Sequence, residues 1–328
     1  MTVLWLVLVL ALLASVFLAI NRREFSPTRC PILLYHRFVR RPADIERYPG
    51  TEKIFTITGD CFEAQILLLK ERGYNFLRLR DIHDIVALRE PMPPRAVAIT
   101  VDDGWTSDVE IMLPILRKHG VPAAFFVTTS PEAWIYDKFR GLDAPLSRDQ
   151  VAALHEAGYE IGSHSVTHPH LIELPDDRIR KEFEESKKTL ESITGTPCIY
   201  LSIPGNFYDR RIRRIAEECG YRAVFTADVG TVTGATELTR IPRLIVEGNF
   251  SLDEFESNLR PFAICTRKLI AALKKVPPRV LGATRYMAVR ERLFSSPLRA
   301  LFIMRRLKMI ALVLALAAVT AAAFLLTR

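Results

Sequence analysis

Residues 98–105 read Ala98-Ile99-Thr100-Val101-Asp102-Asp103-Gly104-Trp105, where an apolar run ends in two adjacent carboxylates and a glycine. The run starts at Val97, is rich in β-branched residues and is too short for a helix, which is typical of a buried parallel strand. Asp102 and Asp103 would lie at the C-terminal end of this strand, where α/β folds carry their chemistry. Two carboxylates this close stay charged at low cost only beside a cation. The alternative is an Asp-Gly turn whose aspartates cap a helix.

Two histidines follow a second strand-like run, in the stretch His164-Ser165-Val166-Thr167-His168-Pro169. A spacing of four residues brings both imidazoles to one side of a helical turn or a tight loop. Two histidines and one carboxylate form a three-ligand site with an open position for water, which is the arrangement of catalytic zinc. The two stretches together therefore predict a site for a divalent metal, with zinc preferred.

Both stretches resemble the first two motifs of the polysaccharide deacetylase family, also called the NodB-homology family. The resemblance runs from Pro31 to Pro261. It includes Ile32-Leu33-Leu34-Tyr35-His36-Arg37, the segment 62–74, and Ile203-Pro204-Gly205-Asn206-Phe207-Tyr208-Asp209. The early Tyr-His pair is most similar to the branch that contains poly-N-acetylglucosamine deacetylases.

The resemblance implies a role for each candidate residue of the site. Asp103, His164 and His168 would bind the metal, which lowers the pKa of water and polarises the amide, and Asp102 would act as general base. The backbone N–H of Gly205, after Pro204, would stabilise the oxyanion. His36 would protonate the leaving amine, and the alternative for His36 is a strand-end histidine hydrogen-bonded to backbone.

The third motif departs from the family at Ser202, where many members carry an arginine that holds the base. Arg243, in Arg240-Ile241-Pro242-Arg243, can serve instead. The late tryptophan that lines the acyl pocket in the family is not evident in this chain.

Strand-like and helical segments alternate between residues 30 and 262, which predicts one catalytic domain with a parallel sheet. Seven or eight such units, together with the resemblance, predict an α/β fold with a distorted (β/α) barrel. The helix expected at 107–118 contains Pro114 and is predicted to be kinked or broken there.

Apolar segments at both ends of the 328-residue chain predict an integral protein of the bacterial plasma membrane. Residues 1–21 and 309–327 are long enough to cross a bilayer as terminal transmembrane helices. Their basic flanks favour a domain on the cytoplasmic face, whereas the resemblance to enzymes of exported polysaccharides favours the other side. A signal peptide is the alternative for the first segment.

Positive charge is concentrated near the C-terminus. Residues 260–328 contain 14 lysines and arginines and one acid, so the net charge of +8 leaves −5 for the rest. In residues 263–308 basic and apolar residues alternate, which predicts amphipathic helices on anionic lipid headgroups rather than on nucleic acid. The alternative is a terminal helix packed on the barrel.

These features predict a metal-dependent hydrolase that removes an N-acyl group, preferably acetyl, from an aminosugar in a polysaccharide or glycolipid. The expected partners are an N-acylated sugar polymer or a lipid-linked sugar. One alternative is a deformylase or deacylase of a lipid-linked aminosugar, which the two apolar segments favour. The other is a non-catalytic carbohydrate-binding scaffold, against which the intact motifs argue.

Overall fold

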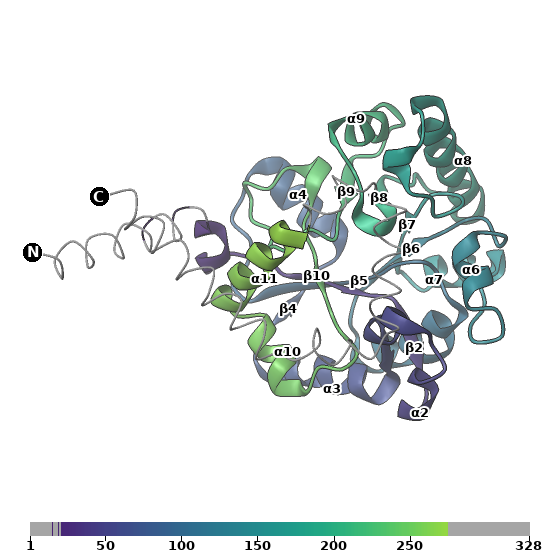
Figure 1. Cartoon of the computed structure of the whole chain (residues 1–328). Helices are drawn as coiled ribbons and strands as arrows, with labels where there is room; N and C mark the ends of the chain where they lie inside the picture. The colour runs from purple at the N-terminus through teal and green to yellow at the C-terminus, as the bar shows by residue number, and fades with distance from the viewer. Residues whose placement is uncertain (1–14, 16–18, 20, 275–328) are drawn as a thin grey trace, which may run out of the picture. The chain divides into compact units, whose positions relative to one another are not determined.

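The computed structural model describes residues 15, 19 and 21–274, and its centre is one sheet of eight parallel strands (Figure 1). The strand order is β10-β1-β5-β6-β7-β8-β9, with β4 paired to β5. A separate parallel pair joins β2 to β3. The strands are β1 (Ile32–Tyr35), β2 (Arg37–Val39), β3 (Thr56–Thr58), β4 (Asn75–Phe76), β5 (Ala96–Val101), β6 (Ala124–Val127), β7 (Glu160–Ser163), β8 (Tyr200–Ser202), β9 (Ala223–Phe225) and β10 (Leu244–Ile245).

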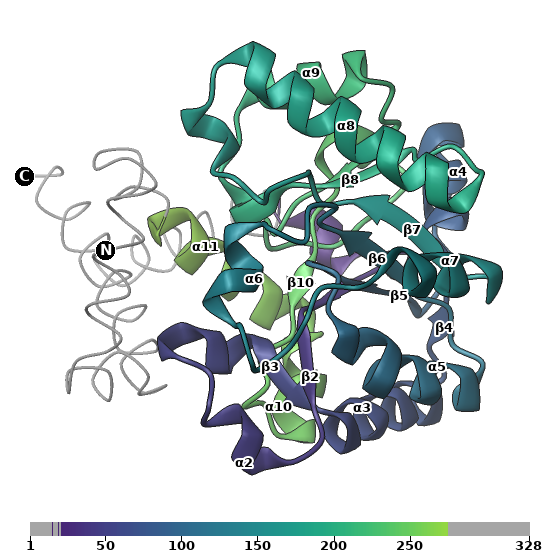
Figure 2. The same cartoon turned by 90° about the vertical axis from the view of Figure 1, so that its right-hand side faces the viewer.

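Helices connect most successive strands and surround the sheet (Figures 1 and 2). The α-helices are α2 (Pro42–Ile45), α3 (Gly59–Glu71), α4 (Leu79–Leu88), α5 (Leu113–His119), α6 (Trp134–Lys138), α7 (Arg148–Glu156), α8 (Asp176–Thr194), α9 (Arg210–Glu218), α10 (Leu252–Asn258) and α11 (Pro261–Lys274). The short helical turns are η1 (Arg22–Phe25), η2 (Gly50–Phe55), η3 (Asp108–Met112), η4 (Leu171–Glu173), η5 (Pro204–Asn206) and η6 (Leu238–Arg240). The helix predicted at 107–118 begins as the π-helical turn η3, because Pro114 cannot donate a backbone hydrogen bond.

Side chains alternate between two cores along the strands. From β5, Val97, Ile99 and Val101 join the larger core, which also contains buried residues of α3, α5, α7, α8 and α9. Ala96 and Ala98 point the other way and pack with residues of α4. These small residues suit the narrow inner face of a curled sheet. The same alternation carries Asp102 to the inner face, at the end of the row.

The curled sheet remains open, as a half-barrel. Within the described residues no ladder joins its two edge strands, β9 and β10. An isolated bridge connects Phe225 of β9 to Ile241, which precedes β10. An irregular segment with η6 separates them, and β10 has only two residues, so no continuous ladder forms. The predicted distorted barrel with terminal transmembrane helices is therefore wrong.

No helix within residues 15, 19 and 21–274 combines the length and the apolar character needed to cross a membrane. The longest helix in this part of the chain, α8, has 19 residues and is rich in charged side chains. The prediction of an integral membrane protein with a cytoplasmic domain is contradicted by this finding. The two segments behind it, 1–21 and 309–327, lie outside the described residues except for 15, 19 and 21.

The predicted lipid-binding segment, 263–308, is described only as far as residue 274, in α11. Ile264 and Cys265 of this helix are buried, and Lys268 forms an ion pair of 3.1 Å with the buried Glu24. The described part of α11 thus packs on the domain. Binding of the whole segment to anionic headgroups stays a prediction, as do the domain boundaries at 30 and 262.

Candidate active site

The candidate residues gather at one edge of the sheet, because parallel strands end on the same side. His36 follows β1, Asp102 and Asp103 follow β5, and His164 and His168 lie in the loop after β7. Pro204 and Gly205 follow β8, and Arg243 directly precedes β10. Seven of the eight residues predicted for the site therefore lie at the C-terminal edge. Arg243, on the N-terminal side of β10, reaches Asp102 at this edge with its long side chain.

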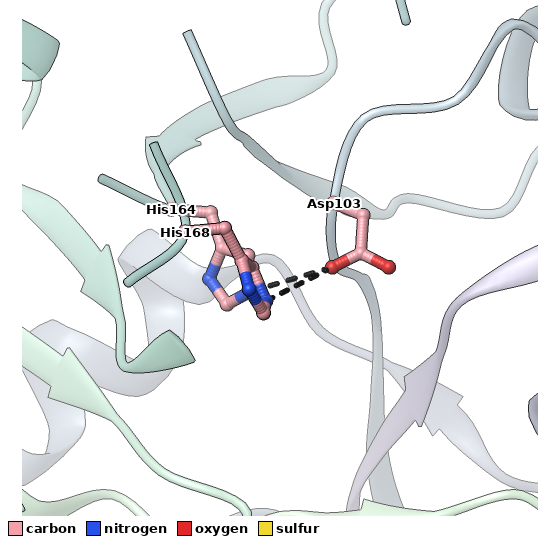
Figure 3. A group of neighbouring side chains, drawn as sticks. All are labelled: Asp103, His164 and His168. Carbon is pink, nitrogen blue, oxygen red and sulfur yellow. Dashed lines mark ion pairs between the residues drawn. The ribbon is translucent and has the colours of Figure 1, made fainter. Parts of the chain in front are cut away.

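Asp103, His164 and His168 bring three possible metal ligands together, and all three side chains are buried. Figure 3 shows both imidazoles directed at the Asp103 carboxylate. Oδ1 of Asp103 lies 3.5 Å from Nε2 of His164 and 3.6 Å from Nε2 of His168. Atoms bound to one tetrahedral zinc ion at 2.0–2.2 Å are about 3.4 Å apart. The donor set and its spacing therefore fit a divalent metal.

The protonation of the two histidines also suits a cation. Nδ1 of His164 faces the Ser202 carbonyl oxygen at 2.9 Å, so a proton on Nδ1 is donated there and Nε2 keeps its lone pair. Burial lowers the pKa of His164, but the carboxylates of Asp102 and Asp103 outweigh it and leave the pKa raised. Burial and the neighbouring His164 lower the pKa of His168 to about 4. The raised pKa of His164 means that the two carboxylates favour a positive charge beside this ring, which a bound metal ion would supply. The lowered pKa of His168 keeps that ring neutral.

The loop that carries both histidines is held in an unusual backbone conformation. Ser165 and His168 have φ angles of 68° and 56°, in the left-handed region. The buried carboxylate of Glu182, on α8, accepts hydrogen bonds of 2.9 Å from the backbone N–H groups of Val166 and Thr167. It also accepts one of 2.7 Å from the Thr167 hydroxyl. The long helix α8 thus fixes the loop.

Asp102 is bound by Arg243 from two sides of its carboxylate. Nη1 and Nη2 of Arg243 donate to Oδ1 and Oδ2 of Asp102, each at 2.7 Å. Ser202 donates its hydroxyl to Oδ2 at 2.8 Å. Burial alone would raise the pKa of Asp102, but the Arg243 guanidinium and then His164 reverse this, and the pKa is lowered. Asp102 is therefore ionised at neutral pH, and its Oδ2 lies 3.9 Å from Nε2 of His164.

The charges of the Asp102 and Asp103 carboxylates affect the pKa of His36. Burial lowers the pKa of His36, while Asp103 and then Asp102 raise it, and the net change is downward. Its ring packs 5.0 Å from that of Phe55, and among the described residues its buried Nδ1 has no hydrogen-bond partner. At the end of β8, Gly205 is exposed with a φ of 63°, and a Cβ there would lie 4.0 Å from the His170 ring.

Residues 89–224 match the family model described as polysaccharide deacetylase. This part of the chain is a polysaccharide deacetylase domain. Enzymes of this family are metal-dependent hydrolases of N-acetyl amide bonds, and Asp103, His164 and His168 are the possible metal site of this one. His36 and Arg243 lie outside the matched residues, although the fold places His36 at this edge of the sheet and brings the Arg243 guanidinium to Asp102.

Individual relatives agree with the deacetylase match. The Bacillus subtilis protein YxkH is 25% identical over 230 residues, which cover 70% of this chain and 76% of YxkH. Poly-β-1,6-N-acetyl-D-glucosamine N-deacetylase of Staphylococcus aureus is 24% identical over 213 residues, or 62% of this chain and 71% of the relative. The structure of Streptococcus pyogenes deacetylase PplD in complex with acetate has a TM-score of 0.61 at 24% identity, covering 71% of this chain and 99% of PplD. The last likeness concerns the fold.

Three residues beside the deacetylase site were not predicted from the sequence. Trp105 donates its indole N–H to Oδ2 of Asp103 at 3.1 Å. Trp134 donates to the His168 carbonyl oxygen at 2.7 Å, and Glu182 holds the histidine loop. Trp105 could have been suspected because it follows the Asp-Asp-Gly motif directly. Trp134 and Glu182 carry no signal, since only the tertiary fold brings α6 and α8 to the site.

Proposed function

We propose that this chain is a metal-dependent hydrolase that removes the N-acetyl group from an aminosugar in a polysaccharide, with zinc as the preferred metal. One observation carries the proposal. An ionised carboxylate, Asp102, is fixed by Arg243 beside three buried atoms with the spacing of tetrahedral metal ligands. A relative that deacetylates poly-β-1,6-N-acetyl-D-glucosamine supports this class of substrate.

Each residue of the site has a chemical task in this proposal. A metal bound by Asp103, His164 and His168 would supply Lewis acidity, which lowers the pKa of water and polarises the amide carbonyl. Asp102 takes the proton of the attacking water, since Arg243 keeps it ionised. The backbone N–H of Gly205 donates to the oxyanion. His36 would give a proton to the departing amine nitrogen. Burial opposes the protonated imidazole, and the charges of Asp103 and Asp102 favour it.

The alternatives have less support. A deformylase or deacylase of a lipid-linked aminosugar would need the same metal site, but a relative that acts on poly-β-1,6-N-acetyl-D-glucosamine supports the acetyl group. A carbohydrate-binding scaffold would need neither the buried ion pair of Asp102 nor the three clustered ligands. Acetate is therefore the expected product, and formate is the product that would indicate the deformylase.

The test is release of acetate from poly-N-acetylglucosamine and from N-acetylated peptidoglycan by purified full-length protein. We expect release that a chelator abolishes and added zinc restores. Asp102→Asn should keep the metal, and its rate of acetate release should fall by a factor of about 10² to 10⁴, as for other general bases. Asp149→Asn, on the exposed start of α7, is the control with unchanged activity. Zinc-loaded protein that releases no acetate from either polymer would refute the proposal.

A further inference from the structure

The two oxygens of the Asp103 carboxylate have different surroundings. Oδ2 accepts the indole N–H of Trp105 at 3.1 Å, and Trp105 is fully buried. Oδ1 is the oxygen that faces both histidines, at 3.5 and 3.6 Å from their Nε2 atoms. The indole therefore engages one oxygen on the side of the carboxylate away from the other ligands.

Aromatic contacts fix the position of this indole. The Trp105 ring makes edge-to-face contacts with Tyr136 at 4.9 Å and with Phe139 at 5.5 Å. Its backbone N–H donates to Oδ2 of Asp108 at 2.9 Å. Tyr136 also donates its hydroxyl to the carbonyl oxygen of Asp103 at 2.7 Å. The same aromatic group thus holds both the side chain and the backbone of Asp103, whose φ is 80°.

The buried guanidinium of Arg37 packs against the aromatic cluster of Trp105, Tyr136 and Phe139. Arg37, which is 1% exposed, lies 4.1 Å from the ring centre of Phe139 and 5.5 Å from that of Trp105. Its charge is paired with Glu52, which also binds Lys138 at 3.1 Å. Arg37 directly follows His36 in the chain. The pair β2–β3 and helix α6 thereby support the first ligand of the site.

We propose that Trp105 is a positioning residue that makes Asp103 a one-oxygen metal ligand, with Oδ1 toward the metal, and that Arg37 and Phe139 keep the indole in place. This inference rests on the metal site of the proposed function. A hydrogen bond to the outer oxygen orients the carboxylate and discourages binding through both oxygens. Partners of this kind change metal affinity about 10- to 100-fold when they are removed.

The test compares Trp105→Phe with wild type, using zinc and cobalt alone as probes. Trp105→Phe keeps an aromatic ring and removes the N–H. We expect a zinc dissociation constant about 10-fold higher in chelator competition. The visible spectrum of the cobalt-loaded variant should change toward a higher coordination number, because Oδ2 becomes available. Phe255→Leu, at a buried position of α10 outside this aromatic cluster, is the matched control and should lower stability while keeping the cobalt spectrum.

Substitution of Trp105 by 3-benzothienylalanine keeps the ring shape without the N–H, so it gives the same readouts if Trp105→Phe does not fold. Wild-type affinity and a wild-type cobalt spectrum in the folded variant would overturn the inference and leave the proposed function standing. A wild-type protein that binds neither zinc nor cobalt would overturn both.

Discussion

At the scale of single residues, the unexpected part of the site is the position of the arginine that binds the Asp102 carboxylate. Family resemblance puts an arginine at position 202, and this chain has serine there. Ser202 and Arg243 bind the same oxygen of Asp102 and also each other, at 2.6 Å. The sequence predicted Arg243 as a substitute. It could not predict that Ser202 stays in the network, because that depends on how the curled sheet brings together the ends of β5 and β8, which β6 and β7 separate.

Arg243→Met should disable the base and destabilise the fold. It leaves a buried carboxylate without its partner, which costs about 3–5 kcal/mol of unfolding free energy. Arg243 holds the pKa of Asp102 below its usual value, so its removal lets burial raise that pKa. The base must be ionised, and the acid limb of kcat/KM should therefore move to higher pH. Activity against pH and urea unfolding measure the two effects.

The double variant Ser202→Arg with Arg243→Ser is the matched rescue. It moves the guanidinium to the position usual in the family, and we expect it to recover part of the activity that Arg243→Ser loses. A wild-type acid limb in Arg243→Met would contradict the assigned role of Arg243.

His168→Ala should abolish stoichiometric metal binding, because one of three clustered donors is lost. Metal analysis of the purified variant measures this directly. Asp102→Asn serves as control, since Asp102 lies beside the three ligands and is not one of them, and should retain the metal. Full metal occupancy in His168→Ala would remove this histidine from the ligand set.

At the scale of elements, segments with strong patterns were well predicted. The strand β5 begins one residue before its expected start at Val97, because the apolar run is continuous over its whole length. The β2–β3 pair was missed. Its strands have three residues each and include Arg37, Thr56 and Thr58, so no apolar alternation marks them. Burial of these polar residues depends on partners distant in sequence.

The contact between α8 and the histidine loop gives a prediction at this scale. Glu182→Gln keeps the shape but removes the charge of the acceptor. Its NH₂ group also replaces the oxygen that accepts the Thr167 hydroxyl, so at least one charge-assisted hydrogen bond is lost. Such a bond contributes about 1.5–3 kcal/mol. We expect a loss of this size in unfolding free energy and faster amide hydrogen exchange in residues 164–168. Glu185→Gln, on the exposed face of α8, should change neither.

At the scale of the whole molecule, the parallel sheet followed from alternating elements, whereas its closure did not. Whether two edges meet depends on strand twist and on the length of β10, which is only two residues. The local pattern of apolar and polar residues predicts neither the twist of the strands nor the length of β10. The site was more predictable than the barrel, because every strand of a parallel sheet delivers its end to the same edge, whatever the curvature.

The stability of the molecule should depend on pH through Asp108. Burial and then the neighbouring Asp143 raise the pKa of Asp108 well above its usual value. The unfolded chain loses this proton near pH 4, while the folded protein retains it. Stability therefore falls by about 1.4 kcal/mol per pH unit between the unfolded and the folded pKa.

Asp108→Asn should remove this contribution and keep an acceptor for the Trp105 backbone N–H. Relative to wild type, the variant should gain unfolding free energy between pH 5 and pH 7, by at most about 1.4 kcal/mol per pH unit. Urea unfolding at both pH values measures the gain, with Asp149→Asn as control. An equal pH dependence in wild type and Asp108→Asn would show that Asp108 ionises normally.

The distance along the chain between Asp102 and Arg243, 141 residues, has a consequence during synthesis. A ribosome adding about 5–20 residues per second makes Arg243 roughly 7–28 s after Asp102. During that time the strands β6 to β9 are added to the nascent chain, without the cation that stabilises a buried Asp102. The larger core cannot be completed until β10 emerges and pairs with β1, near the start of the domain. A product that terminates before Arg243 therefore keeps its metal ligands but lacks a functional base. Deacetylase activity is then expected only from chains whose translation reached the end of the domain.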